Sequence, residues 1–164
     1  MAINDLLIRP VTVEELDRCA HVVRESFMTV AGDFGITVEN CPTNPAFITT
    51  DRLTAEMQKG NLLYGFFENG ELIGFFLLEQ KAAELFYLER LAVLPGYRHK
   101  GYGAQILRFA KESVREKGGS MLSIGIIEEN AILKDWYIRN VFVPTGTRKF
   151  EHLPFTVGFL ECAL

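Results

Sequence analysis

The segment Leu91–Ala104 has the residue types and spacing of an anion-binding turn. An apolar strand is followed by Arg98 and Lys100, and then by Gly101 and Gly103 where a helix is expected to begin. Backbone N–H groups in the first turn of a helix have no partner inside the helix, and the helix dipole adds about half a positive charge there. Glycine lets the backbone approach a ligand closely, and the cationic side chains add charge. The turn predicts a phosphate site, although a solvated basic turn with glycines for geometry alone would have the same spacing.

Two common nucleotide-binding motifs are missing from this turn. A nucleoside-triphosphate loop reads G-x-x-x-x-G-K-[ST], and no such string occurs in the chain. The dinucleotide fingerprint G-x-G-x-x-G requires a third glycine, but Ile106 stands at that position after Gly101 and Gly103. Both usual nucleotide ligands are therefore disfavoured.

A strand and two helices are expected before the middle of the chain. The strand lies around residues 6–9, and Thr12 with Glu15 forms the S/T-x-x-E capping box that starts a helix. A loop rich in Gly, Pro, Asn and Thr follows, and a second short helix is predicted at about residues 51–59. The loop runs over about residues 30–50, and loops as long as this are usually functional or disordered.

Three strands are predicted in the middle of the chain. Asn69-Gly70 separates the apolar runs NLLYGFF and ELIGFFLLEQ, and both residues accept the positive φ of a type I′ hairpin turn. The segment Glu84–Leu94 is apolar apart from Glu89 and Arg90, which is typical of a strand at the centre of a sheet. Strict alternation predicts two faces for this strand, with Tyr87, Glu89, Leu91 and Val93 on one and Phe86, Leu88, Arg90 and Ala92 on the other.

The remaining elements complete a mixed α/β sheet. An amphipathic helix is predicted from the turn to Lys117, then a strand at MLSIGII, a short helix at residues 129–140 and two strands around 145–150 and 155–162. Strand, helix and strand in succession indicate a parallel βαβ unit beside an antiparallel meander. The predicted fold is one domain over residues 1–164, with a mostly antiparallel sheet of about six to seven strands and about four flanking helices.

Composition and charge narrow the classes of function. The chain has 164 residues, of which 48% are hydrophobic and 23% charged, so a disordered chain is excluded and a substantial core is expected. Seventeen Lys and Arg against 21 Asp and Glu give a net charge of −4. That sign opposes binding of nucleic acid or anionic lipid through the overall field.

Cysteines, histidines and apolar runs predict a cytoplasmic protein with no metal site. Cys19, Cys41 and Cys162 lie far apart without metal-ligand spacing and are expected to be reduced thiols. None of the three histidines has a second ligand at metal-like spacing. The amino terminus lacks a signal-peptide pattern, and the longest apolar stretch, LIGFFLL, is far shorter than the roughly 20 residues that span a bilayer.

The turn and a later segment resemble the GCN5-related N-acetyltransferase family, usually called GNAT acyltransferases. The family's [RQ]-x-x-G-x-[GA] motif after a strand is similar to Arg98–Gly103 after ERLAVLPGY. Asn130 and Tyr137 lie seven residues apart in NAILKDWYIRNVF, which looks like the family's N-x-x-A-x-x-[LF]-Y-x-[KR]-x-G-F segment. The element order also agrees, so the resemblance covers essentially the whole chain and implies the GNAT fold. His99, Leu133 and Val141 stand where the family often has glycine, alanine and glycine.

The resemblance implies acetyl transfer from acetyl-CoA to an amine that attacks the thioester directly in a ternary complex. The cofactor would lie between the strand at Leu91–Val93 and the strand at Met121–Ile126. Backbone amides of the turn would hold the pyrophosphate, and Val93 would pair with the pantetheine like an added strand. The Leu91 amide would face the acetyl carbonyl as an oxyanion donor. The implied cofactor-binding residues are Leu91, Ala92, Val93, Arg98, His99, Lys100, Gly101, Tyr102, Gly103, Ala104 and Asn130.

Tyr137 and Glu89 are the candidate catalytic residues. Tyr137 occupies the family's catalytic tyrosine position, and its phenol can protonate the departing thiolate at neutral pH; packing beside Trp136 is the alternative. Glu89, placed by alternation in an apolar wall, would have a raised pKa that suits a base for the amine; an ion pair with a Lys or Arg is the alternative. Asn130 could bind the pantetheine or cap the following helix.

The acceptor, the oligomeric state and one alternative function are left open. In this family the first two helices and the loop between them wall the acceptor site, here residues 27–50, which contain Asp33 and Glu39 but no Lys or Arg. That charge favours a cationic amine, whether a small molecule, a peptide amino terminus or a ribosomal-protein terminus. Homodimer formation is compatible with the resemblance. The alternative function is a non-catalytic CoA- or acyl-CoA-binding sensor or regulatory module that uses Tyr137 and Glu89 structurally.

Overall fold

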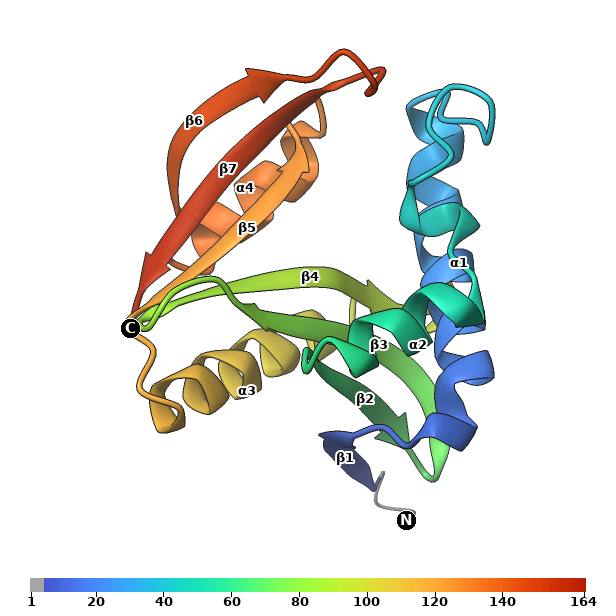
Figure 1. The fold of residues 1–164 in the computed structure, drawn as a ribbon, viewed down its shortest axis with the longest axis vertical. Helices are drawn as coiled ribbons and strands as arrows, with labels where there is room; N and C mark the ends of the chain where they lie inside the picture. Colours follow the sequence, from blue (N-terminus) through green and yellow to red (C-terminus); the bar gives the residue numbers. More distant parts are fainter. Residues whose placement is uncertain (1–4) are drawn as a thin grey trace.

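A seven-stranded sheet in the order β1-β2-β3-β4-β5-β7-β6 forms the centre of the fold (Figure 1). The computed structural model describes residues 5–164. The strands are β1 (Leu6–Pro10), β2 (Leu62–Glu68), β3 (Glu71–Gln80), β4 (Leu85–Val93), β5 (Met121–Ile127), β6 (Val143–Lys149) and β7 (Thr156–Ala163). The helices are α1 (Leu16–Asp33), α2 (Thr50–Gln58), α3 (Tyr102–Glu116) and α4 (Ala131–Arg139). Among the strands of residues 5–164, only β4 and β5 pair in parallel, which confirms the predicted mixed, mostly antiparallel sheet.

Local sequence signals fix the start of α1 and the β2–β3 hairpin. The Thr12 N–H donates to Glu15 Oε1 at 2.9 Å, which confirms the capping box at the short 3-10 turn that leads into α1. Asn69 has a φ of 51° and Gly70 a φ of 82°, the pair of positive values that a type I′ turn requires. Both elements therefore form where the sequence predicts them.

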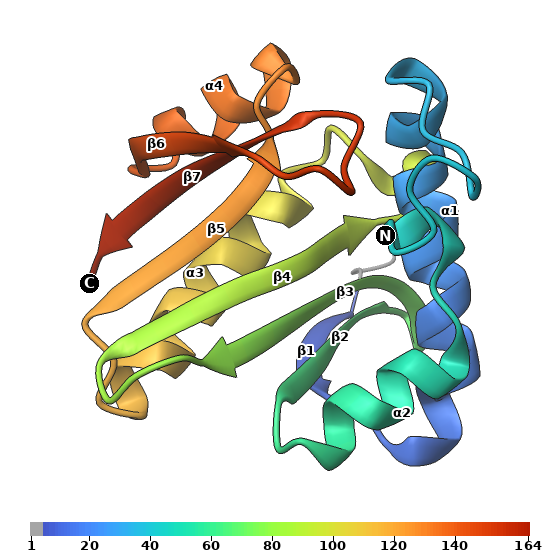
Figure 2. The ribbon, with the colours of Figure 1, turned by 45° about the horizontal axis from the view of Figure 1, so that its top comes forward.

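The sheet separates two apolar clusters. Figure 2 shows α3 on one side of the sheet, here called the α3 face. Ile106 and Leu107 of α3 pack there in one cluster with residues of the strands and with Tyr137 of α4. On the other side, the α1 face, α1 and α2 pack with Val23 and Leu53. The helical spacing of these apolar residues buries one stripe of each helix and leaves the rest in water.

β4 and β5 are neighbours over only their first part. Their parallel pairs are Leu85–Met121, Phe86–Leu122 and Tyr87–Ser123. Beyond Tyr87 the two strands separate, as Figures 1 and 2 show, while β4 continues to pair with β3 as far as Val93. The second half of β4 therefore has an open edge toward β5.

A bulge at Arg90 changes which faces the β4 side chains take. Arg90 has a φ of 53°, and between the pairs Leu77–Glu89 and Phe75–Ala92 two β4 residues oppose a single β3 residue. An inserted residue reverses the faces of the side chains that follow it. Glu89 lies opposite a β3 residue of the α1-face cluster, on the same side as Ala92, whereas Leu91 and Val93 pack against the α3-face cluster. The strict alternation predicted for this strand, with Glu89, Leu91 and Val93 together, is therefore wrong beyond the bulge.

Candidate active site

The turn between β4 and α3 presents backbone amides that the helix does not use. The first bond within α3 runs from the Gln105 N–H to the Gly101 carbonyl at 3.2 Å. The amides of residues 101–104 precede that bond and have no partner in the helix. His99 and Gly101 have left-handed φ values of 63° and 80°, which favour a concavity lined by successive amides. This geometry fits the predicted phosphate site.

The two glycines of the turn have different structural roles. A Cβ on Gly101 would have no neighbour within 4 Å, so the backbone there is open to a ligand. A Cβ on Gly103 would lie 3.0 Å from Cζ2 of Trp136, so the missing side chain allows α4 to approach α3. The free space that the sequence assigned to both glycines is present at Gly101 and is filled by an indole ring at Gly103.

The side chains of the turn are only partly available to a ligand. Tyr102 is buried at the start of α3, and its hydroxyl donates to Glu68 Oε1 at 2.6 Å, so its contribution to the turn comes from the backbone. His99 and Lys100 are exposed. Ala104 is half-buried and lines a basic pocket that is described below.

The Arg98 guanidinium points toward α1. It donates from Nη2 to the Ser26 carbonyl at 2.7 Å and from Nη1 to Thr29 Oγ1 at 3.0 Å. Its Nε donates to the Val93 carbonyl at 3.2 Å, and its backbone N–H donates to the Pro95 carbonyl at 3.3 Å. Burial lowers the pKa of this guanidinium. Arg98 therefore ties the turn to α1, and its side chain is not directed at the amides that would hold a phosphate.

Replacing Arg98 with Met is expected to lower the free energy of unfolding by about 1.5–3 kcal/mol, the contribution of hydrogen bonds to a charged group. Urea denaturation followed by circular dichroism measures this change. Lys100→Met is the matched control, because this exposed cation should alter stability by less than about 0.5 kcal/mol. An Arg98→Met protein of unchanged stability but weakened acetyl-CoA binding would instead identify the side chain as a phosphate ligand.

Glu89 lies beside the bulge with its carboxylate partly buried. The side chain is 30% exposed, and its Oε2 is 3.6 Å from Arg90 Nη1. Burial raises the pKa of Glu89, Arg90 lowers it, and the carboxylates of Glu79 and Glu56 raise it further. The predicted raised pKa and the alternative ion pair are therefore both present at this side chain.

Tyr137 is buried in α4 on the α3 face. Its ring packs edge-to-face on Trp136 at 4.9 Å and on Phe142 at 5.3 Å between ring centroids. Burial raises the pKa of the phenol well above its usual range, so the hydroxyl is protonated at neutral pH and can donate. The packing interpretation is confirmed, and the role as a general acid stays a prediction.

Asn130 caps α4. Its Oδ1 accepts a hydrogen bond from the Leu133 N–H at 3.2 Å, which confirms the helix-cap interpretation. A hydrogen bond from the Asn130 side-chain nitrogen to the pantetheine stays a prediction.

Val141 adopts a backbone conformation that favours glycine. Its φ is 73°, in the left-handed region that is strained for a β-branched residue. The left-handed φ therefore explains why the family that this chain resembles often has glycine at this position. Val141 is 71% exposed, so its side chain makes little packing contribution to offset the strain.

Val141→Gly is expected to raise the free energy of unfolding by about 1 kcal/mol, because the strain relieved exceeds the entropic cost of glycine. Chemical denaturation measures the difference. Val143→Gly is the control: Val143 is also exposed, but it lies in extended β6, so glycine there should destabilise by about 0.5–1 kcal/mol. Equal effects at the two positions would contradict the strain.

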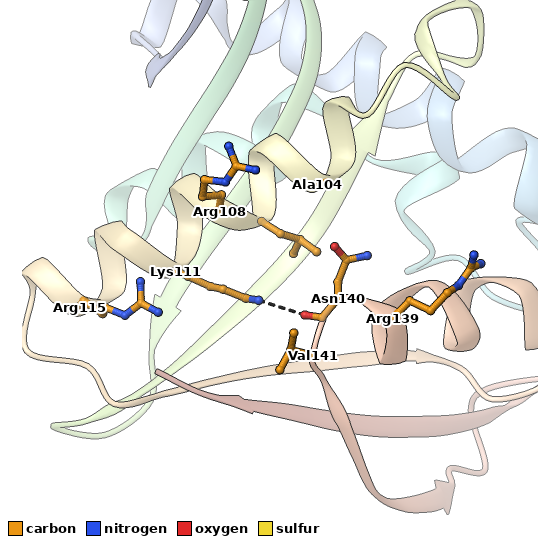
Figure 3. Close-up of a pocket in the computed structure, with 8 residues that line it drawn as sticks. Ala104, Arg108, Lys111, Arg115, Arg139, Asn140 and Val141 are labelled. Carbon is orange, nitrogen blue, oxygen red and sulfur yellow. Dashed lines mark hydrogen bonds between the residues drawn. The ribbon is translucent and has the colours of Figure 1, made fainter.

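A basic pocket of about 270 Å³ lies beside the turn, between α3 and the end of α4 (Figure 3). Ala104 forms part of its wall, and the Lys111 Nζ donates to the Asn140 carbonyl at 3.0 Å. Arg139 pairs with Asp135 at 2.9 Å. The cations that line the pocket are Arg108, Lys111, Arg115 and Arg139.

Sequence reasoning missed this pocket. The sequence predicts α3 only as an amphipathic helix, whose charged residues are expected to face solvent, and the fourth cation comes from another helix. The spacing of Arg108, Lys111 and Arg115 at i, i+3 and i+7 is a usable signal, because it gathers three cations on one helix face.

The three cysteines are buried free thiols. Among residues 5–164, no three His, Cys, Asp or Glu side chains gather where they could hold a metal ion. No helix in this part of the chain is long and apolar enough to cross a membrane.

The family model of the acetyltransferase (GNAT) family matches residues 33–140. The chain therefore belongs to the acetyltransferase (GNAT) family. This confirms the family that its motifs resemble and the prediction that the protein is an acetyltransferase. An uncharacterized N-acetyltransferase in the pepI 3′ region of Lactobacillus delbrueckii subsp. lactis is 26% identical over 161 residues, which cover 90% of this chain and 87% of that protein.

Two solved structures are similar over nearly their whole length. The PaiA N-acetyltransferase of Thermoplasma acidophilum, in complex with coenzyme A, has a TM-score of 0.79 at 23% identity, with 98% of this chain and 99% of that chain covered. The ribosomal-protein-S18-alanine N-acetyltransferase of Escherichia coli has a TM-score of 0.77 at 15% identity, with 97% and 94% covered. These similarities confirm the predicted fold.

Proposed function

We propose that this protein transfers the acetyl group of acetyl-CoA to a primary amine, which attacks the thioester directly in a ternary complex. The open edge of β4, which leads into the amide-lined turn, is the observation that carries this proposal. The β4 backbone beyond Tyr87 is not paired with β5, so the two amide groups of a pantetheine arm could pair there like an added strand. The pyrophosphate would then reach the amides at residues 101–104.

The basic pocket supports the same ligand. CoA carries a third phosphate on its ribose, a short distance beyond the pyrophosphate. The pocket shares Ala104 with the turn and is lined by four cations, so it lies where that phosphate would follow. A ligand with a pyrophosphate for the turn and a further phosphate for the basic pocket complements this surface better than a single anion does.

The residues around the thioester can divide the chemistry between them. Acetyl-CoA supplies the acetyl thioester; a bond forms from the amine nitrogen to its carbonyl carbon, and the bond from that carbon to sulfur breaks. The Leu91 amide would donate to the carbonyl oxygen as negative charge develops there. The ammonium of the acceptor loses two protons in all. Glu89, directly or through water, would take one to solvent, and Tyr137 would deliver the equivalent of the other to the departing sulfur.

Ligand binding and thiol release together test this function. Native mass spectrometry should show a complex with acetyl-CoA, and incubation with a panel of amines should release free thiol and yield acetylated product. Gly101→Val is the matched control for binding, because a Cβ at its left-handed φ would enter the open space over the amides. Binding of CoA without thiol release from any amine would favour the non-catalytic sensor instead.

A further inference from the structure

A second pocket, of about 160 Å³, lies where the α1–α2 loop meets the bulge of β4. The charged residues that line it are both arginines, Arg52 from α2 and Arg90 from β4. Thr43, Asn44 and Thr49 are the polar uncharged residues of its lining. The carboxylates of the loop, which favoured a cationic acceptor in the sequence, do not line this pocket.

Arg90 has hydrogen-bonding capacity that its neighbours do not use. Its side chain is only 13% exposed, with Nη2 3.7 Å from Glu56 Oε1 and Nη1 3.6 Å from Glu89 Oε2. Both distances exceed a hydrogen bond, and Nη1 is buried without a hydrogen-bond partner in residues 5–164. Because a buried donor without an acceptor is costly, Arg90 retains unused hydrogen-bonding capacity, and its side chain lines the pocket.

Glu56, a carboxylate close to the two pocket arginines, is shared among three cations. Glu56 is 3% exposed and accepts from Asn61 Nδ2 at 2.6 Å, and it also lies 3.5 Å from Arg52 Nε and 3.7 Å from Lys59 Nζ. Glu56 thus faces three cations, Arg90 among them, and Glu89 is the second carboxylate of this group. Three cations against two carboxylates leave an excess positive charge. Glu79, next to Glu89, is paired with a lysine at 3.2 Å.

We propose that this pocket binds a carboxylate of the acceptor, so that the amine acetylated here is a compact one that also carries a carboxylate. The inference rests on the proposed acetyltransferase function and names its substrate class. The planar fork of an arginine matches a carboxylate through two parallel hydrogen bonds. Arg90 directly follows Glu89 in β4, so a carboxylate bound at Arg90 would hold a nearby amine close to the candidate base. A free amino acid and a peptide with an acidic first residue both have this chemistry.

The decisive comparison is between acids and their carboxamides. Thiol release is measured with glycine and L-methionine, each beside its α-carboxamide, with the peptide amides Asp-Ala-Ala and Asn-Ala-Ala, and with spermidine. We expect kcat/KM for an acid to exceed that for its amide by about 10- to 100-fold, the effect of losing a charge-assisted hydrogen-bonded pair. A preference for the free acids over Asp-Ala-Ala identifies a free amino acid as the source of the carboxylate, and the reverse identifies a peptide.

Variants connect the preference to the pocket. Arg90→Met should reduce the acid-to-amide ratio to about 1, and Arg52→Met, at a more exposed position, should reduce it in part even if Arg90→Met does not fold. Arg18→Met is the matched control, because Arg18 lies on the exposed side of α1 and should leave the ratio unchanged. Amides or spermidine acetylated as well as the acids would overturn the carboxylate pocket and leave the proposed function intact.

Calorimetry separates failure of this inference from failure of the proposed function. If no probe releases thiol, the acetyltransferase proposal fails, and titration of the same acids and amides into the CoA-bound protein still tests the pocket. Acids that bind at least tenfold more tightly than their amides, with loss of that difference in Arg90→Met, would support it. Equal binding of acids and amides would overturn it.

Discussion

Tyr137→Phe is expected to lower kcat for acetyl transfer by about 10²–10⁴-fold, the usual contribution of a positioned proton donor. The substitution removes one hydroxyl from a ring that is otherwise held by Trp136 and Phe142, so the packing of α4 should persist. Because burial keeps the phenol protonated, its donor function should not vary across the neutral pH range. Steady-state kinetics at saturating acetyl-CoA measure the change in kcat.

The KM for acetyl-CoA separates catalysis from structure in this experiment. A residue that acts on the departing sulfur should change kcat while KM stays within a fewfold of its original value. Tyr97→Phe is a matched control, because it also removes one phenolic hydroxyl. Tyr97 lies just before Arg98, and its ring faces the exposed Lys100, with Nζ 5.4 Å from the ring centroid. A Tyr137→Phe enzyme with unchanged turnover would leave Tyr137 with a packing role alone.

Glu89→Gln is expected to lower kcat/KM by about 10²–10⁴-fold at neutral pH and to remove the acidic limb of the pH–rate profile. Only the carboxylate form can accept a proton, so activity should rise with pH through the pKa of Glu89. Burial raises that pKa, which places the limb above the ordinary glutamate value of 4.5. The profile is measured between pH 5 and 9 at fixed ionic strength, with acetyl-CoA saturating.

The stability of the Glu89→Gln protein distinguishes a Glu89 that acts as a catalytic base from a Glu89 that forms a structural ion pair. A carboxyl group whose pKa is raised on folding binds its proton more tightly in the folded state, so its contribution is favourable at low pH and is lost as the pH rises through the folded pKa. Glu89→Gln should therefore not destabilise the protein at neutral pH.

Glu79→Gln is the control for the pH–rate profile, because it removes a neighbouring carboxylate and should keep the acidic limb. A limb that persisted in Glu89→Gln would argue against the base.

Local signals made much of this fold predictable. The capping box at Thr12, the hairpin at Asn69-Gly70 and the helix start at Gly101 each depend on residues a few positions apart, and each forms where expected. The phosphate turn belongs to this group, because its unused amides follow from the end of one element and the start of the next.

The bulge and the two pockets depend on contacts between distant segments. Arg90 adopts a positive φ without being glycine or asparagine, so the strand sequence does not indicate a bulge; the pairing with β3 fixes it. The sequence predicts that the Arg98 side chain adds positive charge at the phosphate turn, but Ser26 and Thr29 of α1 supply its hydrogen-bond partners. The residue pattern of one segment does not predict the bulge or the hydrogen-bond partners of Arg98, because packing between distant segments determines both.

If acetyl-CoA binds in the opening between β4 and β5 as proposed, the short junction of these strands would link the lifetime of the protein to its supply of substrate. Three residue pairs join these two strands before they separate, so a ligand in the opening would bridge two parts of the sheet. A ligand that binds only the folded state adds about 1.4 kcal/mol to the free energy of unfolding for each tenfold rise in its concentration above Kd. Cells with abundant acetyl-CoA would then expose less unfolded chain to their proteases, and starvation would shorten the life of the protein as well as slow its reaction.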